Sequence, residues 1–200
     1  MSDRMNVCQD AGYNAIRARK ADDQLEPRGR FVVEHFRKGV KIGQYEFLNG
    51  ITNEGKNKLL NVMFHGTSAI TTWWLGMISN SGYSALAVGD TYAQIAGSNG
   101  WTEFTDYADA ANSNSASTRP EWTEGAASGQ AITNASPVVF DITGSGTVKG
   151  LFLVGGAAGA QTKGDHAASG AVLWATALFG TGDVAVNADD QLKVTYTVSA

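Results

Sequence analysis

Cysteine is almost absent from this 200-residue chain, because Cys8 is the only one. A single cysteine excludes an internal disulfide framework, and neither a cysteine nor a histidine stands at zinc-finger spacing from it. Long apolar runs are also lacking, and the N-terminus has no basic segment followed by an apolar one. We therefore expect a soluble protein that does not bind membranes and carries no conventional export signal.

Histidine is scarce too, and His35, His65 and His166 lie far apart in the sequence. None of them shows the spacing of a metal site or stands near a paired nucleophile. The adjacent acids Asp189 and Asp190 fit a turn before a strand, whereas a glycosidase needs two carboxylates that face each other across a groove. The sequence thus predicts no catalytic residue, no metal ligand and no cofactor site, and we expect that the protein is not an enzyme.

The charges are divided unevenly along the chain, although the net charge is only −4. Residues 1–58 hold 11 of the 15 lysines and arginines but 8 of the 19 acidic residues, which gives them a net charge of +3. Residues 59–200 have a net charge of −7. A balance of +3 interleaved with acids lacks the dense basic stripe of nucleic-acid-binding proteins, so we expect no direct nucleic-acid contact. Docking on an acidic protein surface fits this pattern better.

Clear helical spacing occurs only within residues 47–66. Thr52 or Asn53 can cap the start of a short helix, and Gly66 stands where a helix end favours a residue with positive φ. An apolar stripe runs along this helix and consists of Leu59, Leu60, Met63 and Phe64. The pattern predicts one amphipathic helix at a junction between two unlike regions.

The residues before this helix predict an arm and a hairpin. Residues 1–30 hold few core-forming side chains, so we expect an N-terminal arm that orders against a partner, or else a plain disordered leader. Residues 14–21 can form only two helical turns, which are marginal in water.

Residues 31–36 and 40–47 have strand patterns around the turn Arg37-Lys38-Gly39, which predicts a hairpin. Because a lone hairpin is barely stable, this one has to pack on the helix, the body or another chain. We assign residues 31–66 to a hairpin-and-helix junction.

Residues 67–200 have a β pattern with glycine-rich turns, and we assign them to a β-sandwich body. The expected strands cover residues 71–78, 138–142, 147–154, 171–179 and 191–198. The low-complexity residues 106–130 predict a surface loop with a role in contacts. The predicted fold class is mainly β: a β-sandwich or jelly-roll-like body with one short helix, an extended N-terminal arm and a β-hairpin.

Several segments together carry a resemblance to a known group of proteins. They are residues 47–60, 73–78, 101–103, 119–122 and 182–198. Over roughly residues 30–200 the chain resembles small structural proteins of tailed bacteriophages, whose members are similar to capsid decoration (cement) proteins or to tail and fibre accessory proteins. The resemblance implies a virion component and implies no catalytic residue.

The leading hypothesis is a capsid decoration protein that clamps neighbouring major capsid subunits and stabilises the head. It would be made in the host cytoplasm, lie on the capsid surface of the virion, bind the major capsid protein and form a homo-oligomer, a dimer or a trimer. The predicted capsid-binding residues are Arg17, Arg19, Lys20, Arg28, Arg30, Phe31 and Phe36. Two modest contacts on one shell reinforce each other, because linkage raises the overall affinity.

The alternative hypothesis is a tail or fibre accessory module that binds a host receptor or a glycan. Its contact surface would consist of Trp101, Tyr107, Trp122 and the loop of residues 106–130. Copy number per virion separates the two hypotheses, since a lattice needs many more copies than a tail. A virion-borne glycosidase, the third class, has the least support because no convergent acids are visible.

Overall fold

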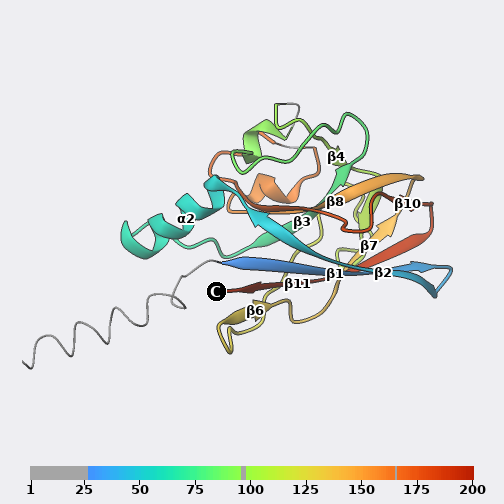
Figure 1. Cartoon of the computed structure of the whole chain (residues 1–200), viewed down its shortest axis with the longest axis horizontal. Helices are drawn as coiled ribbons and strands as arrows, with labels where there is room; N and C mark the ends of the chain where they lie inside the picture. The colour runs from blue at the N-terminus through green and yellow to red at the C-terminus, as the bar shows by residue number, and fades with distance from the viewer. Residues whose placement is uncertain (1–26, 96–97, 165) are drawn as a thin grey trace, which may run out of the picture.

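The computed structural model describes residues 27–95, 98–164 and 166–200. Its strands pair antiparallel into one 11-stranded sheet, ordered β4-β3-β8-β9-β2-β1-β11-β7-β5, with β10 beside β8 and β6 beside β11 (Figure 1). The strands are β1 (Arg28–Arg37), β2 (Val40–Ile51), β3 (Trp73–Ser79), β4 (Glu103–Phe104), β5 (Tyr107–Asp109), β6 (Ala131–Thr133), β7 (Val138–Ile142), β8 (Gly146–Gly155), β9 (Val172–Leu178), β10 (Val184–Val186) and β11 (Asp190–Ser199). The helices are α2 (Asn53–Phe64) and the short 3-10 helices η1 (Tyr92–Gln94) and η2 (Ala158–Gln161).

The predicted hairpin exists, and it is joined to the body. Lys38 and Gly39 form its turn with φ angles of 52° and 77°, a conformation that two-residue hairpin turns favour. Strand β1 pairs with β11 along its whole length, from Arg28 opposite Ser199 to Arg37 opposite Asp190. The hairpin that we expected to form a junction is therefore a central part of the sheet, and β11 supplies the partner that a lone hairpin lacks.

The expected N-terminal arm overlaps the sheet at its end. Strand β1 begins at Arg28, so residues 28–30, which we assigned to the arm, are strand residues. All three pair with β11, and Gly29 and Arg30 also pair with β2. The remaining arm residues 1–26, including the two helical turns expected at residues 14–21, lie outside the described residues.

Strand β2 connects the two layers of the sheet. It pairs with β1 over most of its length, and its last two residues, Gly50 and Ile51, pair with Thr176 and Ala175 of β9. We call β1, β2, β5, β6, β7 and β11 the first layer, and β3, β4, β8, β9 and β10 the second layer. Apolar side chains from both layers meet in one main core, to which the first layer gives Phe31, Val33, Phe47, Phe140 and Tyr196, and the second layer gives Leu75, Met77, Leu151 and Leu153.

The second layer is covered on its other face as well. Phe152 and Val154 of β8 alternate with the main-core residues and belong to a second cluster with Tyr92, Ile95 and Trp101. These partners come from the irregular segment between β3 and β4. Burial on both faces explains why β3 and β8 have continuous apolar runs in place of alternation.

The predicted fold class, mainly β with a sandwich-like body and one short helix, is confirmed. The expected strand at residues 138–142 coincides with β7, and those at residues 147–154, 171–179 and 191–198 match β8, β9 and β11 to within one residue at each end. The sequence patterns missed β4, β5, β6 and β10, which have only two or three residues each. Strands that short show no alternation that a sequence pattern can reveal.

Candidate functional site

Helix α2 is anchored to the body by its first turn. The Gly55 N–H donates to the Thr52 Oγ1 at 3.0 Å, so Thr52, one of the two predicted caps, is the N-cap. The Thr52 hydroxyl donates in turn to the Leu173 carbonyl at 2.5 Å, and the Thr52 N–H donates to the Trp174 carbonyl at 3.0 Å. Gly55 lies against β9 so closely that a Cβ there would be 2.7 Å from the Trp174 oxygen. The start of the helix is thus fixed to β9.

A carboxylate strengthens this anchor. Glu54 Oε2 accepts hydrogen bonds from the Leu173 N–H at 2.6 Å and from the Tyr92 N–H at 3.0 Å. Glu54 also lies in the first helical turn, where the helix dipole favours negative charge. One side chain therefore ties α2 to both β9 and η1.

Replacing Thr52 by alanine is expected to lower the free energy of unfolding by about 1–2 kcal/mol, because the cap acceptor and the bond to Leu173 are both lost. Amide hydrogen exchange within residues 55–64 should accelerate more than exchange in β11. Thr52→Ser keeps the hydroxyl and serves as the control. Equal stability of the alanine and serine variants would contradict the anchoring role.

The rest of α2 extends away from the sheet (Figure 1). Most of its apolar stripe is exposed. Leu60 is 54% exposed, Met63 67% and Phe64 82%, whereas the only buried residue of the helix is Gly55. The predicted stripe exists, but three of its four residues face solvent instead of the core. Exposed clusters of large apolar side chains mark interaction sites in soluble proteins.

A groove runs beside this helix, between α2 and the start of β1. Its volume is about 500 Å3, and its lining consists of Pro27, Arg28, Ile51, Lys56, Leu59, Leu60 and Trp174. The groove thus combines an apolar floor from α2, β2 and β9 with two basic residues. We call Leu60, Met63 and Phe64 the α2 face, and the cavity beside them the α2 groove.

The turn of the β1–β2 hairpin forms the opposite end of the molecule (Figure 1). Val40 is 65% exposed and Ile42 is 50% exposed, next to the exposed turn residues Lys38 and Gly39. We call these four residues the hairpin tip. The molecule therefore presents exposed apolar side chains at both of its ends.

The base of the hairpin tip is held rigidly by a buried carboxylate. Asp190 accepts from the Arg37 Nε and Nη2 at 2.8 Å each, contacts the His35 Nε2 at 2.8 Å and accepts from the Asn187 N–H at 2.9 Å. The hydrogen bonds from Arg37 hold the pKa of the Asp190 carboxyl well below its ordinary value, although burial opposes this shift. The network joins the end of β1 to the start of β11 and orients the tip.

A second buried network centres on Glu103. Its two oxygens accept from the Arg119 Nε at 2.8 Å and Nη2 at 2.7 Å, from the Tyr107 hydroxyl at 3.0 Å and from the Gly164 N–H at 3.0 Å. His166 Nε2 lies 3.3 Å away. The side chains of Glu103 and Arg119 are 1% and 0% exposed. The bidentate pair ties the low-complexity segment of residues 106–130 to β4, and the contacts of Gly164 and His166 with Glu103 tie β4 to the loop after η2. We therefore assign this network a structural role.

Acid should weaken the fold through this network. Burial raises the pKa of the Glu103 carboxyl, but the bonds from His166 and Arg119 outweigh burial and lower it from 4.5 to about 2. Because the pKa of Glu103 is lower in the folded than in the unfolded chain, its carboxylate stabilises the native state at pH values above about 4.5. This contribution is lost as the pH falls from about 4.5 toward 2. Urea denaturation should show a loss of about 3 kcal/mol over that range.

The control for this prediction is a pair of charge-removing variants. Glu103→Gln, although less stable at neutral pH, should have a flatter pH dependence below pH 4.5, whereas Glu46→Gln, at an exposed pair with Arg30, should keep the wild-type slope. An unchanged slope in Glu103→Gln would contradict the assignment.

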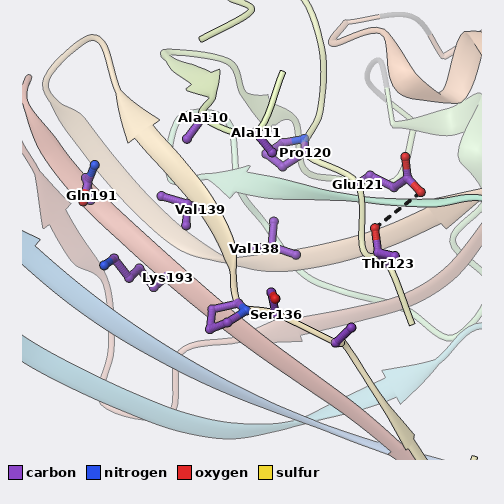
Figure 2. A pocket seen from close by; sticks show the side chains of 12 residues that line it. Ala110, Ala111, Pro120, Glu121, Thr123, Ser136, Val138, Val139, Gln191 and Lys193 are labelled. Atoms are coloured by element: carbon purple, nitrogen blue, oxygen red, sulfur yellow. Dashed lines mark hydrogen bonds between the residues drawn. The ribbon is translucent and has the colours of Figure 1, made fainter. Parts of the chain in front are cut away.

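A third surface feature is a groove of about 550 Å3 over β7 and β11. Figure 2 shows Glu121 and Thr123 on one side, Gln191 and Lys193 on the other, and Val139 between them. The Thr123 hydroxyl lies 3.5 Å from Glu121 Oε1. Polar groups of both charges therefore flank an apolar floor, in a volume typical of small-ligand sites.

The structure divides the seven predicted capsid-binding residues. Arg17, Arg19 and Lys20 lie outside the described residues. Arg28 and Arg30 are exposed on β1, and Arg30 pairs with Glu46 at 2.5 Å. Phe36 is half-buried beneath Lys193, whose Nζ lies 4.6 Å from the ring centroid. Phe31 is fully buried in the main core, stacked on Tyr196, so it cannot contact a partner and its assignment is corrected.

The alternative ligand surface is corrected for the same reason. Trp101, Tyr107 and Trp122 are 1%, 0% and 4% exposed, so they form no exposed platform. Each polar tip has a buried partner: Trp101 Nε1 donates to Asp90, the Tyr107 hydroxyl donates to Glu103, and Trp122 Nε1 donates to the Tyr196 carbonyl. These residues hold the loop segments in place as core residues.

Sequence reasoning missed the direction of the α2 face and the Glu103–Arg119 pair. Helical spacing shows which residues share a side of a helix, but not which side faces the body. A usable signal was Gly55, which has no side chain and permits the close approach to β9. The ion pair joins Glu103 of the two-residue strand β4 to Arg119, 16 residues away in an irregular segment, and no local spacing rule connects them.

Comparison of the chain with protein-family models, with curated proteins and with solved structures found no match. Within the part of the chain that the structure describes, no group of three or more histidine, cysteine or acidic side chains is placed to hold a metal ion. No helix in that part is long and apolar enough to cross a membrane.

Proposed function

We propose that this chain is a structural protein that docks on an assembled protein shell through the α2 face. The observation that carries the proposal is the exposure of Leu60, Met63 and Phe64 on a helix that is firmly anchored at its other end. A rigid helix with an apolar side in water is suited to lie in a groove of a partner, because its ordering is already complete before binding.

The hairpin tip supplies a second contact at the other end of the molecule. Val40 and Ile42 are exposed there, and the Arg37–Asp190 bonds fix the base of the tip. A protein with two separate apolar ends can bridge two neighbouring subunits of a lattice. Linkage of two modest contacts raises the overall affinity by roughly 10²–10⁴ when both can engage at once.

The resemblance to phage structural proteins suggests which shell this is. We propose the capsid, with the major capsid protein as partner and with the virion surface as location, so that the chain acts as a decoration protein that stabilises the head. Each specific contact would bury on the order of 1,000 Å2 or more. Self-association as a dimer or trimer remains part of this proposal.

The groove over β7 and β11 favours the second candidate, a tail or fibre accessory module that binds a receptor or glycan. Its polar rim of Glu121, Thr123, Gln191 and Lys193 can orient a small ligand over the apolar floor (Figure 2). This surface replaces the buried aromatic residues that the sequence suggested for the same function.

The proposal is tested by cosedimentation of the purified chain with heads assembled without it. Binding that saturates at a fixed number of copies per capsid subunit supports a decoration protein, and no binding to heads contradicts it. The same assay on a chain that lacks residues 1–26 measures the contribution of the arm. A truncation to residue 30 is unsuitable, because it removes the start of β1 and its pairing with β11.

A further inference from the structure

The α2 groove lies at the point where residues 1–26 join the body. Pro27, the first described residue, lines the groove together with Arg28 of β1. The opposite wall consists of Lys56, Leu59 and Leu60 of α2. The groove therefore lies beside the first described residue of the chain.

Leu25 is the last apolar residue before Pro27 in the sequence. It stands two residues before Pro27, and two residues span at most about 7 Å. By chain length it can therefore reach the groove that Pro27 lines, whose apolar floor consists of Ile51, Leu59 and Trp174. So short a tether gives Leu25 a high effective concentration at the groove of its own chain, well above that of a second copy.

The charges of the segment around Leu25 and of the groove are complementary. Leu25 is surrounded by acids, since Asp22, Asp23 and Glu26 flank it. The groove contributes two basic residues to its lining, Arg28 and Lys56, and both are exposed. An acidic segment with one apolar side chain fits an apolar floor with a basic rim.

We propose that residues 22–26 dock in the α2 groove of the same chain, with Leu25 seated between Leu59 and Trp174. The docked segment covers part of Leu60 and fixes the direction in which the rest of the arm leaves the body. The contact belongs to the free chain, so it does not depend on the partner proposed above and is tested without it.

Limited trypsin digestion of the full-length chain tests this contact. Arg17, Arg19 and Lys20 precede the docked segment, and docking should slow their cleavage relative to a synthetic peptide of residues 1–27. Leu25→Ser and Leu59→Ser should each accelerate cleavage by roughly tenfold, because each removes one side of the same apolar contact. The double variant should be no faster than either single one. Val40→Ser, at the hairpin tip, is the matched control and should leave the rate unchanged.

Three results would overturn the proposal. Cleavage of the wild-type chain at the rate of the free peptide would mean that no docking occurs. Acceleration by Leu25→Ser without acceleration by Leu59→Ser would place Leu25 elsewhere. Protection that is lost on dilution would mean that the segment occupies the groove of a second copy. Leu60→Ser, at a more exposed position of the groove, serves if circular dichroism shows that Leu59→Ser is misfolded.

Discussion

Replacing Arg119 by methionine should lower the free energy of unfolding by about 3–5 kcal/mol. The substitution keeps an apolar stem of similar length but leaves the Glu103 carboxylate buried without its cation. The Arg119 Nη1 also donates to the Ala160 carbonyl at 2.5 Å, so a buried acceptor in η2 loses its partner as well. Because domains of ordinary stability unfold with 5–15 kcal/mol, this single change should bring the chain close to the limit of folding.

Urea denaturation at neutral pH measures this effect, and Arg30→Met is the matched control. Arg30 also pairs with a glutamate, Glu46, but both side chains are 53% exposed. Exposed pairs contribute no more than about 1 kcal/mol, so the control should remain near wild-type stability. Similar losses of unfolding free energy in the two variants would show that burial is not the reason for the large contribution of the Glu103–Arg119 pair to stability.

The double variant Leu60→Asp/Phe64→Asp should lose at least about 100-fold in affinity for heads, because two central apolar contacts of a docking surface typically contribute 2 kcal/mol or more each. Both side chains are largely exposed in the structure and neither belongs to a core cluster, so the stability of the fold should change little. Cosedimentation gives the affinity, and urea denaturation confirms that the variant is folded.

Leu48→Asp is the control for this second prediction. Leu48 is 72% exposed, on β2 opposite Arg30 in the register, and it lies outside the α2 face. The same exchange of an exposed leucine for aspartate should therefore leave head binding within a few-fold of wild type. If α2 and Leu48 variants bind equally well, the α2 face is not the docking surface.

Local patterns predicted the fold well where the local signal was strong. The Thr52 cap and the alternation in β11 are short-range features, and both are present in the structure. The arrangement of the hairpin was beyond such patterns, because its partner β11 is more than 150 residues away in the sequence. Pairing between distant segments depends on the whole sheet and leaves no mark in a single window of sequence.

The candidate site was only partly predictable for a related reason. Aromatic residues such as Trp101 and Trp122 suit either a core or a binding surface, and their composition does not distinguish the two. The apolar stripe of α2 was visible, but a stripe predicts contact without saying whether the contact is internal. The close packing of Gly55 on Trp174 and the exposure of Leu60, Met63 and Phe64 show that the start of the helix contacts the body while most of the stripe faces solvent.

The most direct test of the proposed capsid role is quantitative mass spectrometry of purified virions, which compares the copy number of this chain with that of the major capsid protein. We predict about one copy for every one to three major capsid subunits, the ratio of a protein that follows the symmetry of the lattice. Fewer than about one copy per twenty capsid subunits would contradict capsid decoration and favour the tail module. The groove over β7 and β11 would then be the surface to mutate.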